Sequence, residues 1–543
     1  MSGTTVRSAA GSSRRTEAGT RGWLPSLTPA GVVILAGTLF ALGLRAYQLA
    51  QPGHLLGVGD YDDGADFGSA LRLIHGALPY RDFIIVQPPG ITLLMTPAAA
   101  LSRLVGTAWA IGVGRMLTVA ASAAAVAFGG LLVRHRGVFA TVVTCGIIAV
   151  YPGGVQAAHT VLLEPWLTVF CLAGAVAVFD GDRLAGGRRL VWGGVMLGFA
   201  GAIKVWAIIP VVVIAAACLP RVREAARFLA GVVAGFAVPV LPFAAASFGR
   251  FYSSVVVAQL VRTGARTPMA FRLQYLTGLT SWNPGGAAFT AAAIVIVIAV
   301  AGTLVAACRL TGQGLTALEW FGVVTAVLIV VAFLVPGEFY YHYPAFLAPF
   351  LALAFALPAA RILDARRARP VSERPVSQRP VSQRPARWWR SAAGLAGLVL
   401  VVAPLAVPGA EDSPTPTYAG ALPAIERVIP PGACVVSDQA SLLISANRFV
   451  SGVPGCPLIV DGTGTSYALG HGQSPLTSGR VPAVAALWRQ AFGAARYALL
   501  TSYNSNRIAW TPALRAYFRD NFVLVRGDWA PLSLYVRKGA QRH

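Results

Sequence analysis

The sequence predicts an all-α polytopic membrane protein with about eleven transmembrane helices, followed by a small C-terminal α/β domain. The 543 residues are 56% hydrophobic and only 12% charged, and the mean hydropathy is +0.64. A hydrocarbon core about 30 Å thick needs roughly 20 apolar residues per helix, and such runs recur from residue 32 to beyond residue 401. The net charge of +23 resides in short loops and tails, which is typical of topology signals. We therefore expect a lipid bilayer around the chain and no nucleic-acid partner.

The order of apolar runs and basic loops predicts the topology. Residues 1–25, rich in Ser, Thr, Gly and Arg, are expected to form a disordered cytoplasmic tail. No small-residue cleavage site follows the first apolar run, so that run is expected to stay as a span. Spans are expected at residues 30–49, 108–133, 138–151, 160–179, two short ones within 190–219, 228–246, 287–307, 318–335, 343–360 and 392–407. The expected domains are a membrane domain over 26–360, a basic Pro-rich cytoplasmic linker over 361–390, a last span over 391–409 and an extracytoplasmic domain over 410–543.

The last part of the chain has a different sequence pattern, without long apolar runs. Short β-rich runs at 433–437, 497–501 and 522–525 alternate with turns and with a helical stretch at 481–492. The run at 522–525 is expected to pair with 532–536 as a hairpin. Cys434 and Cys456 are expected to form a disulfide if this region faces an oxidising compartment. The four other cysteines lie in apolar runs and are interpreted as small core residues.

An acidic cluster follows the first span. Residues 59–90 contain five of the 21 acidic residues of the chain: Asp60, Asp62, Asp63, Asp66 and Asp82. Carboxylates this close repel one another unless water, a cation or a reacting proton stabilises them. The alternative is a solvated acidic loop between spans. The apolar spacing of residues 67–78 predicts an amphipathic helix along the membrane surface.

Further ionisable residues stand out against the apolar background. Glu164 lies at the start of an expected span, where a carboxylate is either functional or paired at the interface. Lys204 suits a phosphate or neutralises an aspartate. The polar loop 247–283 carries four arginines and no acid, so either the topology is wrong there or these arginines bind an anion: Arg250, Arg262, Arg266 and Arg272. Residues 339–343, which include Tyr341 and His342, are either an interfacial aromatic belt or part of a site.

No nucleotide-binding or catalytic-triad motif is present. His159 and His342, with the aspartates, are candidate metal ligands, but no ligand spacing supports a metal site, and the metal ligands stay unknown. The candidate chemistry therefore rests on carboxylates and basic residues gathered at one membrane face.

These residues also resemble a known family. Tyr61-Asp62-Asp63-Gly64, then residues 76–83 (GALPYRDF) and 87–90 (QPPG), resemble the first outer loop of the polytopic GT-C glycosyltransferases, in the branch related to protein O-mannosyltransferases and aminoarabinose transferases. The acidic pair of that family is usually Asp-Glu, so Asp63 departs from it. Residues 159–165, 198–204 and 340–344 are similar to later motifs of the family. The resemblance covers roughly residues 30–360.

The resemblance implies a GT-C-like fold and a sugar transfer from a polyprenyl-phosphate donor to a glycan or protein acceptor of the cell envelope. Asp62 is expected to be the general base of an inverting displacement. The implied roles are Asp62, Asp63 and Glu164 for catalysis, Lys204, Arg262 and Arg266 for the donor phosphate, and Asp60, Gln87, His159, Tyr341 and His342 for substrate binding. Some relatives use a divalent cation, which the aspartate cluster is suited to hold; no other cofactor is implied.

Two alternatives belong to other classes of protein. A transporter or flippase of polyprenyl-linked glycan is expected to show internal repeats and mid-membrane charges, whereas this chain has no repeat among its spans and gathers its acids at one face. A non-catalytic membrane subunit with a glycan-binding outer domain has no need for Asp62 and Glu164 together. We therefore favour a multi-pass enzyme of the cell membrane whose active site and C-terminal domain are extracytoplasmic.

Overall fold

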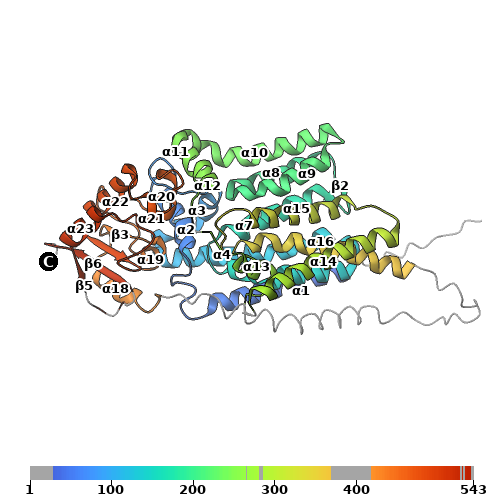
Figure 1. The fold of residues 1–543 in the computed structure, drawn as a ribbon, viewed down its shortest axis with the longest axis horizontal. Coiled ribbons are helices and arrows are strands. Elements are labelled where there is room, and N and C mark those ends of the chain that lie inside the picture. The colour runs from blue at the N-terminus through green and yellow to red at the C-terminus, as the bar shows by residue number, and fades with distance from the viewer. Residues whose placement is uncertain are drawn as a thin grey trace, which may run out of the picture.

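A computed structural model describes residues 28–264, 266–280, 285–368, 418–525, 527, 529 and 532–539. Long helices run side by side in a bundle, and a smaller unit with a sheet lies at one end of it (Figure 1). The tail expected at 1–25, most of the linker expected at 361–390 and the span expected at 391–409 lie outside the described residues.

The bundle and its connections contain most of the described helices. They are α1 (Pro29–Ala50), α2 (Tyr61–Ile74), α3 (Gly90–Ala100), α4 (Ser102–Val133), η1 (Arg134–Arg136), α5 (Gly137–Val150), α6 (Pro152–Ala158), α7 (Leu163–Val178), α8 (Arg188–Ile203), η2 (Val205–Ala207), α9 (Ile208–Cys218), α10 (Val222–Ala246), α11 (Phe248–Tyr252), η3 (Ser253–Val257), α12 (Ala258–Leu260), α13 (Met269–Thr277), α14 (Gly286–Thr311), α15 (Ala317–Leu334) and α16 (Pro344–Ala368). A two-stranded hairpin, β1 (Phe179–Asp180) with β2 (Arg183–Leu184), joins α7 to α8.

Every span expected within the described ranges coincides with a helix. By length and composition, six helical stretches there are able to cross a membrane, or seven if the bent pair α6 and α7 counts as one. The six are Pro29–Ala50, Ser102–Val150, Val222–Ala246, Gly286–Thr311, Ala317–Leu334 and Pro344–Arg367. The expected count of about eleven stays a prediction, because α8, with 16 residues, and α9, with 11, are short for a full crossing.

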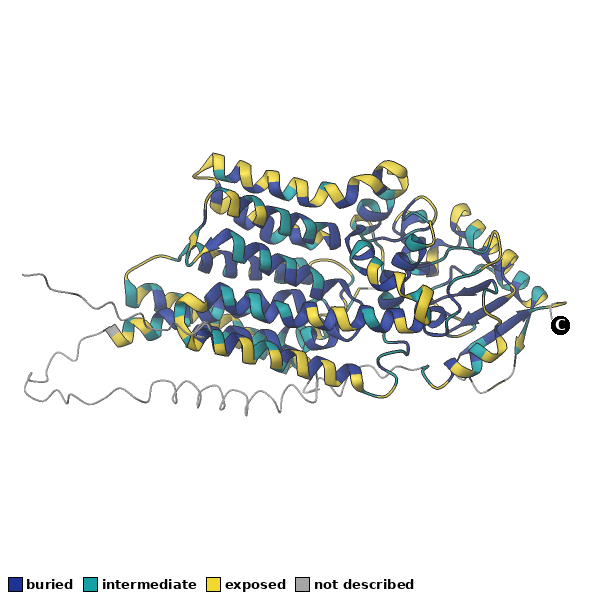
Figure 2. Cartoon of the chain, turned by 180° about the vertical axis from the view of Figure 1, so that it is seen from behind, coloured by how far each residue is buried: buried dark blue, intermediate teal, exposed yellow. Residues whose placement is uncertain are grey.

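The outward faces of the helices are apolar and exposed. In α14 the most apolar window has a mean hydropathy of 2.7, and only 6% of it is buried inside the protein. The outermost helices carry their exposed residues on the side turned away from the bundle (Figure 2). Apolar surface of this extent needs a lipid environment, so the chain is a membrane protein.

Glycines bring α8 and α10 into backbone contact. A Cβ on Gly198 would meet the carbonyl oxygen of Val232 at 2.1 Å, and one on Gly235 would meet that of Val195 at 2.1 Å. Small residues at this spacing let membrane helices approach closely. The contact fixes α8, whose C-terminal end presents Lys204.

The C-terminal unit combines a four-stranded sheet with short helices. Its elements are α18 (Leu422–Val428), β3 (Val435–Ser437), α19 (Ala440–Ser445), α20 (Gly462–Leu469), α21 (Pro475–Ser478), α22 (Pro482–Ala494), β4 (Tyr497–Leu500), α23 (Pro512–Asn521), β5 (Phe522–Val525) and β6 (Ser533–Arg537). The strand order is β3-β4-β6-β5, with β3 parallel to β4 and the other pairs antiparallel. The expected hairpin is confirmed, since β5 pairs with β6.

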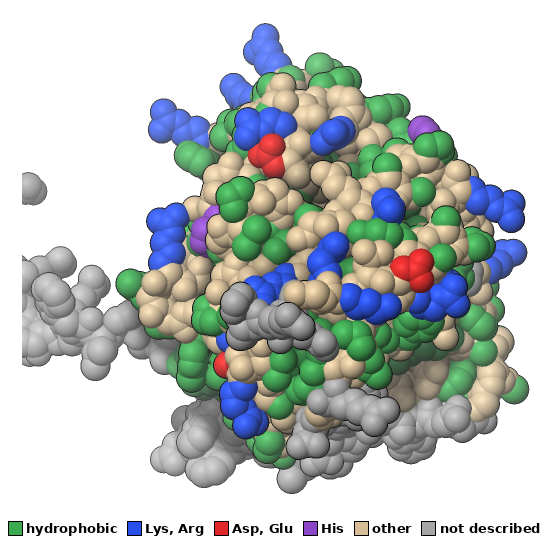
Figure 3. All heavy atoms as spheres, turned by 90° about the vertical axis from the view of Figure 1, so that its left-hand side faces the viewer, with side chains coloured by type: hydrophobic (Ala, Val, Ile, Leu, Met, Phe, Trp, Pro, Cys, Tyr) green, Lys and Arg blue, Asp and Glu red, His purple; other side chains and the backbone are tan. Residues whose placement is uncertain are grey.

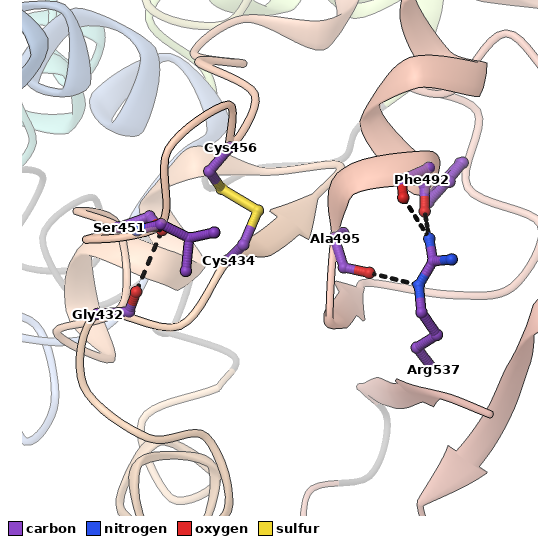
Figure 4. The surroundings of a disulfide bond; sticks show 9 residues. Gly432, Cys434, Ser451, Cys456, Phe492, Ala495 and Arg537 are labelled. Carbon is purple, nitrogen blue, oxygen red and sulfur yellow. Dashed lines mark hydrogen bonds between the residues drawn. A yellow bond between two sulfur atoms is a disulfide. The ribbon is translucent and has the colours of Figure 1, made fainter. Parts of the chain in front are cut away.

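The expected disulfide is also confirmed. Cys434 and Cys456 are joined, with their Cα atoms 5.5 Å apart. The bond ties the chain just before β3 to the loop ahead of α20 (Figure 4). Nearby, the Ser451 hydroxyl donates to the Gly432 carbonyl at 3.1 Å, which holds the same loop.

The C-terminal unit packs directly on α2. A Cβ on Gly64 of α2 would meet the backbone nitrogen of Ser441 in α19 at 2.1 Å. Phe67 and Leu71 of α2 share one buried cluster with Leu442 of α19. The two parts of the chain therefore share a core at the α2 end of the bundle.

On the face of the C-terminal unit that is turned away from the bundle, Lys and Arg side chains are spread among neutral ones and outnumber the acidic ones (Figure 3).

Candidate active site

The N-terminus of α2 gathers the aspartates. Asp60 caps the helix, and its carboxylate accepts a hydrogen bond from the Asp62 backbone nitrogen at 2.8 Å. Acidic residues in the first turn are stabilised by the helix dipole. Asp62 and Asp66, four residues apart, lie on one face of the helix, and both line a cavity.

The cavity has a volume of about 590 Å³ and lies between the bundle and the C-terminal unit. Both parts of the chain supply polar walls. The bundle side contributes Asp60, Tyr61, Asp62, Asp66, Gln87, Glu164, Lys204, Arg262, Tyr340, Tyr341, His342 and Tyr343, and the C-terminal side contributes Gln439, Asp461, Thr463, Tyr467, Asn506 and Arg507. The cavity thus joins eight of the eleven predicted site residues.

A chain of charges crosses the bundle side of the cavity. Lys204 is ion-paired with Glu164, and His342 Nδ1 lies 2.9 Å from the other oxygen of Glu164. His342 Nε2 lies 3.8 Å from Asp62 Oδ2. Burial disfavours the protonated form of His342, but the Glu164 carboxylate outweighs this, and the pKa of His342 is raised above its ordinary value. The imidazole of His342 thus lies between the two carboxylates, and Glu164 favours its protonated form.

Of the two carboxylates beside His342, Asp62 is the accessible one. Its side chain is 46% exposed, whereas that of Glu164 is fully buried. Desolvation inside the cavity raises the pKa of Asp62, although the charge of His342 acts in the opposite direction. A carboxylate that is reachable from the cavity and raised in pKa is suited to accept a proton.

Asp63 points away from the cavity. It is ion-paired with buried Arg115 and accepts a hydrogen bond from the Val161 backbone nitrogen at 2.8 Å. Both side chains are fully buried. The geometry thus fits a structural ion pair, and the expected catalytic role of Asp63 has no support from its position.

Two other predicted residues also lie outside the cavity lining. His159 is buried, with its ring centroid 6.1 Å from that of His54. Arg266 is exposed. Arg262, by contrast, lines the cavity and lies 3.0 Å from Glu338, with its guanidinium 4.3 Å from the centre of the Tyr467 ring. Its Nε is buried and has no hydrogen-bond partner among the described residues, so it keeps a donor for a ligand.

The arginine-rich loop is explained in part by the backbone. Arg272 is buried and donates to the carbonyls of Phe333, Pro336 and Gly337 at the end of α15. Arg250 donates to the carbonyl of Arg81 at 2.9 Å. These arginines satisfy carbonyl groups at helix ends and loops, so Arg262 is the cavity-lining arginine of that loop.

The sequence analysis assigned no site role to several residues that line the cavity. The Tyr61 hydroxyl donates to Asp461 at 2.8 Å and accepts from the Thr463 backbone nitrogen at 2.9 Å. Arg507 lies over the Tyr61 ring, 4.6 Å from its centre. Asp66 is buried, and its Oδ2 has no hydrogen-bond partner among the described residues. Of these, the sequence placed Asp66 in the acidic cluster but gave it no role; its spacing of four residues from Asp62 is the local signal that both share a helix face.

The expected divalent cation finds no ligand set. Across the described ranges, no group of three or more His, Cys, Asp or Glu side chains is placed to share a metal ion. The carboxylates of α2 are divided among a helix cap, the cavity and the Arg115 ion pair.

Solved structures share this fold. The crystal structure of ArnT, a GT-C aminoarabinose transferase, from Cupriavidus metallidurans bound to undecaprenyl phosphate matches with a TM-score of 0.55 and 13% identity, over 93% of this chain and 98% of that chain. The apo structure of the same protein matches with a TM-score of 0.55 and 14% identity, over 94% of this chain and 98% of that chain. No protein-family model matches the sequence, and no curated protein is detectably similar to it.

Proposed function

Since the chain has the GT-C fold, we propose that it is a membrane glycosyltransferase that moves a sugar from a polyprenyl-phosphate donor to a hydroxyl of a cell-envelope acceptor. The observation that carries the proposal is one cavity in which half-exposed Asp62 faces the cations Lys204, Arg262 and His342. The ArnT neighbour, which binds undecaprenyl phosphate, supports a lipid phosphate as the donor group.

The proposed reaction is an inverting displacement. The acceptor oxygen forms a bond to the anomeric carbon of the sugar while the bond from that carbon to the phosphate oxygen breaks. Asp62 accepts the proton of the acceptor hydroxyl, and the polyprenyl phosphate leaves with the bonding electrons. Lys204, Arg262 and His342 stabilise the negative charge that grows on the phosphate.

Glu164 is proposed to position these cations. It contacts both Lys204 and His342, and it is fully buried. With Glu164 between them, Lys204 and His342 have a net charge of one, which matches a phosphate monoanion. Two buried cations without this carboxylate would repel each other. Arg266, outside the cavity lining, has no role in this proposal.

The proposed site faces the extracytoplasmic side. Arg136, Arg183 and Arg221 line a second hollow formed by η1, β2 and the loop before α10. The strand β2 lies at the end of the bundle away from the C-terminal unit (Figure 1). Cytoplasmic loops are enriched in Lys and Arg, and disulfides form in oxidising compartments, so the two observations support the same orientation.

The test is sugar transfer by membranes that contain the full chain, supplied with labelled polyprenyl-phosphate mannose or arabinose. Asp62→Asn should reduce transfer at least about 100-fold, because a general base contributes that much or more. Asp82→Asn is the matched control, since Asp82 lies in the same acidic stretch but outside the cavity. Equal transfer by wild type and Asp62→Asn would overturn the assignment of the base. Movement of the labelled lipid across vesicles without transfer would favour the transporter.

A further inference from the structure

The two walls of the 590 Å³ cavity differ in chemistry. The bundle wall carries the charged set of Lys204, His342, Glu164 and Arg262, which is the set proposed to hold the donor phosphate. The C-terminal wall supplies the planar polar side chains of Gln439, Asp461, Asn506 and Arg507, together with hydroxyl, aromatic and apolar ones. One substrate is a lipid phosphate, so the second wall is left for the other substrate.

The C-terminal wall keeps unused hydrogen-bonding groups. Asn506 is exposed to the cavity, and its amide has no hydrogen-bond partner among the described residues. Arg507 donates from Nη1 to Gln439 Oε1 at 2.5 Å and keeps other N–H groups. An amide and a guanidinium on neighbouring residues offer donors and an acceptor in fixed planes, which match adjacent hydroxyl groups.

The same wall lacks the features that bind an extended peptide. Peptides are commonly bound by addition of a strand to a sheet edge. The edges of the described sheet are β3 and β5, and neither strand lines the cavity. The C-terminal lining residues come instead from residues 418 and 439, the region 461–476 and the loop at 506–507. Scattered polar groups of this kind suit a polyhydroxylated ligand.

Contacts across the cavity tie this wall to the proposed base. Tyr61, which precedes Asp62, donates to Asp461 at 2.8 Å and lies under Arg507. Gln439 donates to the backbone carbonyl of Asp60 at 3.3 Å. A ligand held by Asn506 and Arg507 therefore lies next to the turn of α2 that presents Asp62.

We propose that the C-terminal domain forms the acceptor subsite and that the acceptor is a glycan, bound through Asn506 and Arg507. The proposal rests on the proposed glycosyltransferase function and names its acceptor class. The acceptor hydroxyl is then a sugar hydroxyl, which loses its proton to Asp62 as it bonds to the anomeric carbon and the polyprenyl phosphate departs.

The test uses the purified full chain, labelled polyprenyl-phosphate mannose or arabinose, and a delipidated cell-envelope glycan fraction as acceptor. Asn506→Ala should raise the half-saturating concentration of the glycan fraction about two- to tenfold, as the loss of one or two hydrogen bonds predicts. The half-saturating concentration of the donor should not change. Asn504→Ala is the matched control, because Asn504 lies in the same loop, pairs with Arg515 and is not part of the cavity.

The labelled product identifies the acceptor class directly. A product that resists protease and is degraded by periodate supports the glycan. A protease-sensitive product, or unchanged half-saturation in Asn506→Ala with a wild-type melting temperature, would overturn the acceptor subsite while the enzyme assignment stands. Absence of transfer by the wild type with either donor would overturn the glycosyltransferase and the subsite together.

Discussion

Four aspartates within seven residues of one helix terminus occupy four different environments. Asp60 caps α2, Asp62 is half exposed to the cavity, and Asp63 is bound to Arg115. Asp66 lies one turn after Asp62, and burial together with the charge of Asp62 raises its pKa well above the ordinary value. The residue type is thus the same throughout, and the neighbouring groups decide the environment of each carboxylate.

Asp63→Asn should affect stability rather than chemistry. The substitution leaves buried Arg115 without its counter-charge, and removal of one partner from a buried ion pair costs about 3–5 kcal/mol. We expect a clear drop in the melting temperature of the detergent-solubilised protein, whereas Asp62→Asn should melt like the wild type. A normally stable Asp63→Asn protein without transfer activity would instead place Asp63 in the catalytic machinery.

The pH dependence of transfer should follow Asp62 and His342. Asp62 must be ionised to accept a proton, and burial raises its pKa above the ordinary value of about 3.9, so activity should fall on the acid side at a higher pH than for a free aspartate. His342 loses its positive charge as the pH rises through its raised pKa, which should give a second, basic limb. His342→Gln should remove the basic limb of kcat/KM for the donor and keep the acid limb; an unchanged basic limb would exclude His342.

At the scale of elements, α2 is the helix that packs against both the bundle and the C-terminal unit. The apolar spacing of residues 67–78 predicted an amphipathic helix along the membrane surface, and the structure has a helix from Tyr61 to Ile74. The helix type is confirmed, but the surface position is wrong, because Asp63 to Arg72 are all buried and α19 packs on them. Which aspartate of its first turn faces the cavity depends on α4 and α19, which no local pattern describes.

Gly64→Ala should loosen the contact between α2 and α19. The added Cβ would stand 2.1 Å from the Ser441 backbone nitrogen, and backbone cannot move aside as a side chain can. Overpacking of this kind costs about 1–3 kcal/mol. We expect faster proteolysis of the C-terminal unit and weaker transfer. Gly43→Ala in α1 is the control, because no neighbouring atom lies within 4 Å of the place that its added methyl group would take; equal proteolysis of both variants would contradict the close contact.

At the scale of the whole molecule, the disulfide holds the C-terminal fold. Cys434 and Cys456 are separated by 22 residues, and closing a loop of this length stabilises a domain by about 3 kcal/mol. The double variant Cys434→Ser, Cys456→Ser should therefore unfold its C-terminal unit at a lower urea concentration, followed by proteolysis. Reductant should produce the same shift in the wild type; resistance of both to this change would show that the bond contributes little.

The sequence could predict the part of the candidate site that lies in the bundle, but not the part that lies in the C-terminal unit. Asp62, Glu164, Lys204 and His342 lie in motifs of the bundle, and the structure brings them into one cavity. Asp461 and Arg507 were missed, because their partner Tyr61 lies 400 or more residues earlier and such pairing leaves no periodicity or spacing to read. Long-range contacts determine which residues form the C-terminal wall of the cavity, and a single sequence does not show such contacts.

The contact between Tyr61 and Asp461 also sets an order for biosynthesis. A ribosome that has completed every described helix of the bundle, up to Ala368, has yet to make any residue of the C-terminal wall. A nascent chain at that stage contains the bundle helices and the aspartates of α2. The residues of the C-terminal unit that close the cavity are still missing. Under the proposed function, transfer needs the C-terminal wall, so a stop codon placed between Ala368 and Asp461 should leave the bundle helices complete but without transfer activity.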